Sequence, residues 1–220
     1  PYCNADLAML DPELTVKLPA KITAFTGMDA LTHAIEGITS TGAEPVADAL
    51  GLHAIRLIFK FLPMAVKNPE DITARGNMLI ASSLAGMCFG NTMTGGVHAT
   101  AHALGALYGI PHGLANSIML PFVMDYNVET VADRYMMIAD AMGLDISGKD
   151  PVKAAKMAVE AVVNLNKEIG LTQTLKDFNV PKDKEKLMPL VELASADGQI
   201  SYNPRYLEEE DIIELYMKAI

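Results

Sequence analysis

The sequence predicts an all-α fold, a multi-helix bundle around one hydrophobic core. Half of the 220 residues are hydrophobic, which is enough to bury the sizeable core of one large domain. Apolar residues recur at the helical period in most segments, and proline or acidic residues mark several helix starts. Only residues 2–18 could carry a short strand, and no internal repeat or flexible linker interrupts the chain, so we expect helices to form the fold.

The helices can be placed in order from their start signals. Thr26 followed by Asp29 resembles a capping box and predicts a first helix from 26 to about 38. Pro45 opens a second helix, in which apolar residues recur every 3.6 positions: Ala49, Leu52, Ile55, Ile58, Phe59 and Leu62. Asn68-Pro69 predicts the start of a third, since an N-cap residue followed by proline is typical of a helix N-terminus. Further helical patterns lie near 95–107, 114–125 and 128–142.

The pattern of the last third of the chain predicts ordinary amphipathic helices. Asp150-Pro151 repeats the N-cap and proline signature. A final helix is expected from about 208 to 219, because it opens on four acidic residues, which are favourable at the positive end of a helix dipole. Nothing in this part suggests chemistry.

Charge and composition argue against nucleic acid and membrane as partners. The formal net charge is −10, and no Lys/Arg cluster offers a site for a phosphate backbone. From Gly76 to Met124 the chain has no Asp, Glu, Lys or Arg. Asn91, Asn116 and three histidines nevertheless break any apolar window of about 20 residues, so we expect soluble burial rather than a membrane span.

Two cysteines, Cys3 and Cys88, are too few and too far apart for a disulfide framework or a cysteine-rich zinc site. A reducing cytoplasm is the expected compartment. The first residues lack a basic segment and an initiating Met, so we expect no signal peptide and a piece cut from a longer protein.

Four of the five histidines fall in segments that suggest a metal site. Asp29 and His33 stand four residues apart, which places them on one helix face, about 6 Å apart at Cβ. Such a pair is commonly a simple hydrogen bond. The charge-free run adds His98 and His102 at the same spacing and His112 in a tight turn. A buried imidazole needs partners, and one carboxylate with several neutral imidazoles suits a divalent first-row metal.

Other signals in these segments are weaker. His53 has no acidic or histidine neighbour at helical spacing, so we expect a surface or boundary residue. Gly95-Gly96 and Gly105 would permit close approach of a cofactor, and close helix packing explains them equally well. No zincin, phosphohydrolase or di-iron motif is present. One carboxylate and two or three imidazoles leave an open coordination position, which favours a mononuclear Lewis-acid site.

The histidine segments resemble the iron-containing (group III) alcohol dehydrogenases. The resemblance is carried by GMDALTHAIE at 27–36, AGM at 85–87, GVHATAHALGA at 96–106 and PHGLAN at 111–116. Residues 11–15 and 18–19 are similar to the family's inter-domain segment, and NPR at 203–205 is similar to its C-terminal signature. The resemblance implies an inter-domain segment at 1–20 and an all-helical metal-binding catalytic domain at 21–220.

The resemblance also implies roles for individual residues. Asp29, His33, His98 and His112 match the family's metal ligands, which hold Fe²⁺ and in some members Zn²⁺. His102 matches the non-ligand histidine that lies beside the nicotinamide and is thought to relay a proton. The metal would bind the alcohol oxygen and stabilise alkoxide while hydride leaves for the nicotinamide.

Full-length members carry an N-terminal α/β domain that binds NAD or NADP, and no glycine-rich loop after a strand is found here. The chain is therefore expected to be the C-terminal half of an oxidoreductase of small alcohols, aldehydes and ketones, and to work with that domain as a cytoplasmic homo-oligomer such as a dimer. Alternatives are a zinc glycerol dehydrogenase-like or dehydroquinate synthase-like enzyme, and a non-catalytic metal-binding module, which would not need His102.

Overall fold

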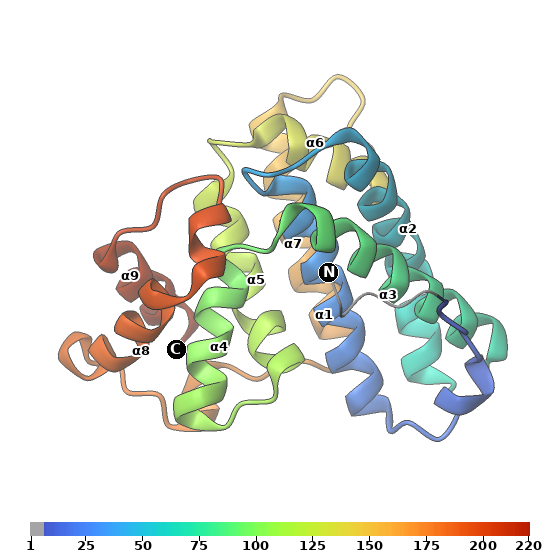
Figure 1. The fold of residues 1–220 in the computed structure, drawn as a ribbon, viewed down its shortest axis with the longest axis horizontal. Helices are drawn as coiled ribbons and strands as arrows, with labels where there is room; N and C mark the ends of the chain where they lie inside the picture. The colour runs from blue at the N-terminus through green and yellow to red at the C-terminus, as the bar shows by residue number, and fades with distance from the viewer. Residues whose placement is uncertain (1–6) are drawn as a thin grey trace.

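Helices form all the regular structure in residues 7–220, the part of the chain that the computed structural model describes (Figure 1). They are α1 (Ala20–Thr39), α2 (Pro45–Lys67), α3 (Ile72–Thr92), α4 (Gly96–Tyr108), α5 (His112–Asn127), α6 (Ala132–Ala141), α7 (Pro151–Glu168), α8 (Lys184–Ala196) and α9 (Glu209–Ala219), with 3₁₀ helices η1 (Pro12–Thr15), η2 (Leu175–Phe178) and η3 (Gly198–Tyr202). No strand occurs within 7–220, which confirms the all-α prediction. The short strand considered for 2–18 is absent from 7–18, and residues 2–6 lie outside the described range.

The first helix begins earlier than its predicted capping box. α1 starts directly after Pro19, and Thr26 lies inside the helix, where its hydroxyl donates to the Ile22 carbonyl at 3.0 Å. The capping-box prediction was wrong, because a threonine hydroxyl in a helix interior also bonds the carbonyl four residues back. Asp29 and His33 consequently lie in the middle of α1 rather than on its first two turns.

The third helix begins later than predicted. Asn68 ends α2 and donates its N–H to the Met64 carbonyl at 2.8 Å. A turn then leads to Asp71, whose carboxylate accepts the Ala74 N–H at 2.9 Å and caps α3. The prediction at Asn68-Pro69 was wrong, because proline is also common just after a helix C-cap.

The remaining predicted starts are confirmed. Glu44 caps α2 ahead of Pro45, and Asp150 caps α7 by accepting two backbone N–H groups at 3.0 and 3.3 Å. Glu208 precedes α9, and its N–H donates to the Asp211 carboxylate at 3.0 Å. The pattern at 128–142 yields the shorter α6, because a turn follows α5.

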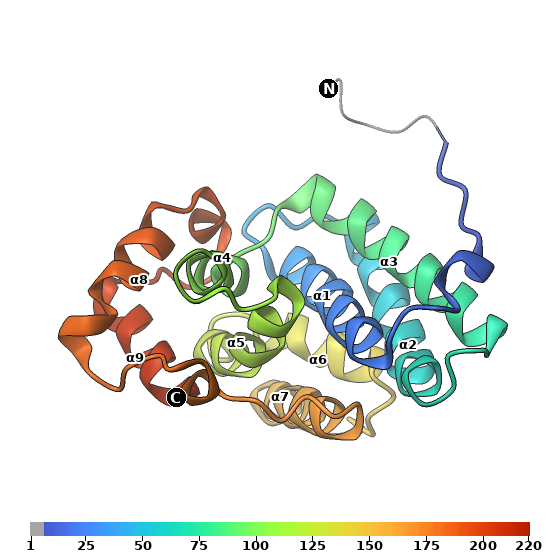
Figure 2. The same cartoon turned by 90° about the horizontal axis from the view of Figure 1, so that it is seen from below.

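One large hydrophobic core contains buried side chains from every helix α1–α9, as the sequence predicts. Seen from below, α1 lies between α2 and α3 on one side and α5 on the other (Figure 2). The start of α5 packs directly on the α1 backbone, since a Cβ added to Gly113 would lie 2.2 Å from the Phe25 carbonyl oxygen. This contact sets the first residue of α5, His112, beside α1.

Among the described helices, α2 is the one that is long and apolar enough to cross a membrane, with a mean hydropathy of 1.5. Its buried face, which includes Ala54, Ile55 and Ile58, packs against α1 and α3. The charge-free run covers most of α3, all of α4 and most of α5, and it is less completely buried than its composition predicts. Ile80 on α3 and Leu107 on α4 expose 43% and 47% of their surfaces.

Candidate metal centre

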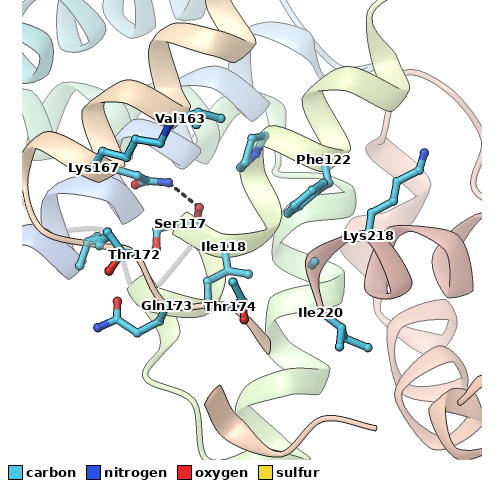
Figure 3. A pocket seen from close by; sticks show the side chains of 14 residues that line it. Ser117, Ile118, Phe122, Val163, Lys167, Thr172, Gln173, Thr174, Lys218 and Ile220 are labelled. Atoms are coloured by element: carbon cyan, nitrogen blue, oxygen red, sulfur yellow. Dashed lines mark hydrogen bonds between the residues drawn. The ribbon is translucent and has the colours of Figure 1, made fainter. Parts of the chain in front are cut away.

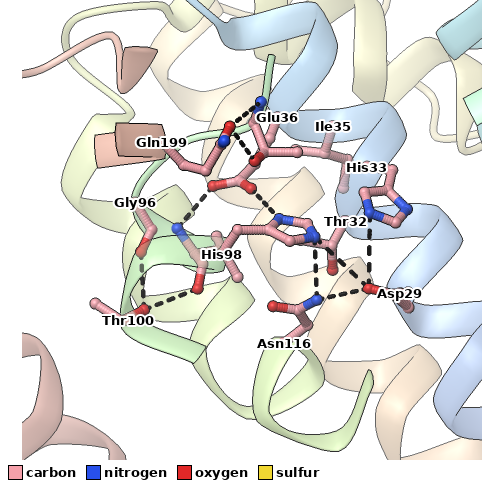
Figure 4. Close-up of polar contacts among 12 residues, drawn as sticks. Asp29, Thr32, His33, Ile35, Glu36, Gly96, His98, Thr100, Asn116 and Gln199 are labelled. Carbon is pink, nitrogen blue, oxygen red and sulfur yellow. Dashed lines mark hydrogen bonds and ion pairs between the residues drawn. The ribbon is translucent and has the colours of Figure 1, made fainter. Parts of the chain in front are cut away.

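Side chains from three helices converge on one carboxylate oxygen. Asp29 and His33 come from α1, His98 from α4 and His112 from the first turn of α5. The Nε2 atoms of His33, His98 and His112 lie 3.9, 3.7 and 3.2 Å from Oδ1 of Asp29. Figure 4 shows Asp29, His33 and His98 pointing toward one another. The structure thus brings together the four side chains predicted as ligands.

The spacing of these donor atoms fits a divalent metal ion. Donors about 2.1 Å from a shared tetrahedral metal lie roughly 3.4 Å from each other, close to the separations measured from Asp29 Oδ1. The ligand atoms of Asp29, His33 and His98 also lie within 4.8 Å of one another. His112 lies outside this tighter group but has the shortest separation from Asp29.

Burial is graded across the cluster. The His98 side chain is 4% exposed, those of His33 and Asp29 are 21% and 22% exposed, and that of His112 is 43% exposed. The cluster is therefore closed on the His98 side and open on the His112 side. A small molecule can approach from the open side.

Asn116, one helical turn after His112, occupies the middle of the cluster. Its side-chain Nδ2 donates to Asp29 Oδ1 at 2.6 Å and lies 3.3 and 3.1 Å from the Nε2 atoms of His98 and His112. Its Oδ1 is buried and has no hydrogen-bond partner among the described residues. Three potential ligand atoms, one carboxylate oxygen and two imidazole nitrogens, thus surround a single amide NH₂ group. Sequence reasoning missed Asn116, although its four-residue spacing from His112 was a usable signal.

Glu36 is a second residue that sequence reasoning missed. Its buried carboxylate accepts the Nδ1–H of His98 at 2.5 Å and the Val97 N–H at 2.7 Å (Figure 4). A carboxylate can only accept, so Nδ1 of His98 must carry a proton, and in the neutral ring the Nε2 lone pair then faces Asp29. Glu36 stands seven residues after Asp29, on the same face of α1. That spacing was visible in the sequence.

The cluster perturbs the pKa values of its own members. Burial by itself would raise the pKa of Asp29, but hydrogen bonds from His112 and His98 hold it well below its usual range. Burial lowers the pKa of His33 to about 4, against the attraction of Asp29. Burial also opposes the charge on His98, but hydrogen bonds to Asp29 and Glu36 outweigh it and raise the pKa of His98 to about 9. At neutral pH His33 is therefore neutral, and His98 carries a second proton.

Metal affinity should consequently change with pH over a higher pH range than the ordinary pKa of histidine predicts. The unperturbed histidine pKa of about 6.5 predicts that affinity falls below that pH. Because the pKa of His98 is raised to about 9, a proton competes with the metal at all lower pH values, so affinity should rise with pH up to about 9. One displaced proton corresponds to about tenfold per pH unit. Titrations of Zn²⁺ against a competing chelator between pH 6 and 8.5 measure this slope, and a flat response would contradict it.

Replacing Glu36 with glutamine should weaken metal binding. Glutamine has one acceptor oxygen for the two donors, the Val97 N–H and the His98 Nδ1–H, and its NH₂ group favours the His98 tautomer that has no free Nε2 lone pair. Loss of such an outer partner typically costs 10–100-fold in metal affinity. The same loss is expected for Glu36→Gln, measured by competition at pH 8.5, the upper end of the titrated range, where proton competition at His98 is weakest.

A matched control is Glu44→Gln. Glu44 caps α2 by accepting the N–H groups of Val46 and Ala47, and it has no contact with the histidine cluster. The Glu44→Gln variant should have a lower free energy of unfolding, because the α2 cap is weakened, and it should keep the wild-type metal affinity. Equal metal affinities for the two variants would show that Glu36 serves only as an acceptor for the Val97 N–H at the start of α4.

His102 lies beside the cluster, and one of its ring nitrogens has a partner outside the cluster. Its ring stacks on that of His112 at 5.2 Å between centroids, and its Nδ1 lies 2.7 Å from Oδ2 of Asp197. Its side chain is 45% exposed. The structure thus places His102 next to the four predicted ligands, with one ring nitrogen engaged outside the cluster. His53, on α2, is exposed and lies apart, as expected.

An aromatic wall borders the cluster on the α3 side. The Phe89 ring stacks on His33 at 4.2 Å between centroids, and His33 stacks on His98 at 4.6 Å. Phe89 is half-buried, and sequence reasoning gave it no role. The histidine cluster therefore has an apolar neighbour on one side and polar groups on the other.

Comparisons with known proteins find relatives over most of the chain. The family model described as "Fe-containing alcohol dehydrogenase family, C-terminal" matches residues 23–220. 1,3-Propanediol dehydrogenase of Klebsiella pneumoniae is 44% identical, covering 95% of this chain and 54% of that protein. Lactaldehyde reductase of Escherichia coli K12 is 40% identical, covering 100% of this chain and 56% of that protein.

The fold also matches solved structures. A crystal structure of 1,3-propanediol oxidoreductase superposes with a TM-score of 0.92 and 42% identity, over 96% of this chain and 55% of that one. The chain thus spans about half the length of the curated relatives it matches.

Proposed function

Because the chain belongs to the iron-containing alcohol dehydrogenase family and has the fold of its C-terminal domain, we propose that it supplies the metal and substrate half of an NAD(P)-linked oxidoreductase site. The reaction would interconvert a primary or small alcohol and its aldehyde or ketone. The observation that carries this proposal is the convergence of three imidazole Nε2 atoms on Asp29 Oδ1, beside a fourth, exposed imidazole whose Nδ1 is engaged by Asp197.

Asp29, His33, His98 and His112 would hold the metal, Fe²⁺ or Zn²⁺, since one carboxylate and three imidazoles suit either ion. Such an ion supplies Lewis acidity that lowers the pKa of a substrate hydroxyl. The ligand side chains are made available to the metal ion in different ways. The low pKa of His33 keeps its lone pair free, and Glu36 holds the Nε2 of His98 toward Asp29.

His102 would exchange a proton with the substrate. It lies one helical turn from His98 and is accessible from solvent, and its Nδ1 is engaged by Asp197. The nicotinamide would lie beside this ring. The Phe89 ring, stacked on His33, would form an apolar wall against the carbon chain of the substrate. A cluster flanked by one aromatic ring suits a small alcohol with an apolar part.

The NAD or NADP would bind mainly to an N-terminal domain outside this chain. Exposed apolar side chains are available for contact with such a domain, among them Leu14, Ile80 and Met87. The segment before α1 is anchored to the bundle, since Arg75 donates to the Leu18 carbonyl at 3.3 Å and to the Thr23 hydroxyl at 2.6 Å. We therefore propose residues 1–20 as the inter-domain segment and 21–220 as the catalytic domain. A cytoplasmic location, supported by the buried free thiol of Cys88, and a homo-oligomeric state are also proposed.

Removal of the metal tests the proposal. We expect the full-length protein to lose alcohol oxidation after treatment with a chelator and to regain it with Fe²⁺ or Zn²⁺, because hydroxyl activation depends on the ion. The measurement is reduction of NAD⁺ or NADP⁺ with a panel of short alcohols, alongside elemental analysis. Full activity in metal-free protein would refute the proposal. Metal binding without any alcohol oxidation would instead favour a non-catalytic module.

A further inference from the structure

Asp197 joins the C-terminal part of the chain to the candidate site. It ends α8 and begins η3. Its Oδ2 lies 2.7 Å from Nδ1 of His102, 95 residues earlier in the sequence, and its Oδ1 accepts the Gln199 N–H at 2.9 Å. Both carboxylate oxygens thus have defined partners. The two contacts together favour one plane for the carboxylate.

The segment that carries Asp197 is itself held to the start of α4. The Gln199 side-chain oxygen accepts the hydroxyl and the N–H of Thr94 at 2.9 and 3.3 Å. The Asn203 side-chain oxygen accepts the Gly96 N–H at 3.2 Å. Because α4 also carries His98 and His102, these bonds fix Asp197 relative to the whole cluster.

The chemistry of the contact determines the state of the His102 ring. A carboxylate only accepts hydrogen bonds, so Nδ1 of His102 must be the donor, and in the neutral ring Nε2 is then the acceptor. The ring lies against His112 at 5.2 Å and is partly open to solvent. An acceptor nitrogen is thereby held at a fixed orientation beside the proposed metal ligands.

We propose that Asp197 is a positioning residue, which holds His102 in the tautomer and orientation that leave Nε2 free to accept the substrate's hydroxyl proton. This inference rests on the proposed function. Asparagine at 197 would keep an oxygen for the Gln199 N–H but would offer an N–H to Nδ1 of His102. The ring would then favour the opposite tautomer, with Nε2 protonated and unable to accept.

The first test reads the tautomer directly and needs no activity. Long-range ¹H–¹⁵N NMR of the 220-residue chain, at a pH where the His102 ring is neutral, should show a proton on Nδ1. In Asp197→Asn the signal should shift toward the Nε2-protonated form. Asp183→Asn is the matched control, since Asp183 caps α8 at its other end by accepting the Glu185 N–H at 3.1 Å. A wild-type ring protonated on Nε2, or identical spectra for wild type and Asp197→Asn, would overturn the proposal.

The second test is a double-mutant cycle in the metal-loaded full-length protein. Asp197→Asn should lower kcat by about 10–100-fold, the usual range for a residue that orients another, and leave metal content and the KM for alcohol near wild type. In a His102→Ala background the same change should have little further effect, because the two residues act as one unit. Additive losses would assign Asp197 a merely structural role and overturn the proposal. If wild type oxidises no alcohol, the proposed function fails, while the NMR result still decides the Asp197–His102 contact.

Discussion

Metal affinity should fall by more than about 100-fold in His112→Ala and in His98→Ala, and it should stay at the wild-type value in His53→Ala. Loss of an outer-shell partner already costs 10–100-fold, so loss of a ligand should cost more. His112 Nε2 lies 3.2 Å and His98 Nε2 lies 3.7 Å from Asp29 Oδ1, whereas His53 is exposed on α2. Elemental analysis after dialysis and competition with a chelator measure the affinities.

His98→Ala and His112→Ala should differ in how much they lower the free energy of unfolding. His98 is buried, and its removal leaves the Glu36 carboxylate with an unmet buried acceptor, which costs about 1–3 kcal/mol or more. His112 is 43% exposed, so its removal should cost less stability than the removal of His98. His112→Ala is therefore the cleaner variant, and thermal unfolding of the metal-free proteins serves as the control. Equal metal content in His53→Ala and His112→Ala, with both folded, would refute the assignment of the ligands.

His102→Ala in the full-length protein should keep metal occupancy near wild type and lower turnover by about 10²-fold. The expected size is that of lost general acid–base help. The two effects should separate because Nδ1 of His102 is engaged by Asp197 and its ring stacks on that of His112, while the candidate ligands are four other side chains. Single-turnover kinetics and metal analysis on the same preparation measure both quantities.

His53→Ala again provides the matched control, since it also removes an exposed imidazole from a helix. It should keep both metal and turnover. The contradictory outcome for His102→Ala is loss of metal in parallel with activity. That outcome would make His102 a ligand and would displace one of the four proposed ones.

Local spacing explains what could be predicted from the sequence. The Asp29–His33 pair follows from a four-residue interval on a helix, and the starts at Pro45 and Asp150 follow from capping chemistry within a few residues. The helical period and the absence of strand signals were enough for the all-α class. The family resemblance lay in contiguous segments, so it too needed no knowledge of the packing.

Two local predictions were wrong because one residue type serves several local roles. Threonine caps helices and also bonds back within them, so Thr26 did not mark the start of α1. Asn68-Pro69 looks the same at the end of a helix as at the start of one. The choice between these roles depends on the neighbouring helices, which a local pattern does not contain.

The sequence by itself determined the helical class, the family and the four candidate ligands; the tertiary structure decided which groups hold them. Three pairs of contacting residues are far apart in the sequence. Glu36 and His98 are separated by 62 positions, Asn116 and Asp29 by 87, and Asp197 and His102 by 95. No helical or strand period relates such distant positions. These contacts exist because α1, α4, α5 and α8 share one core, and a buried or oriented imidazole requires a partner at its second nitrogen.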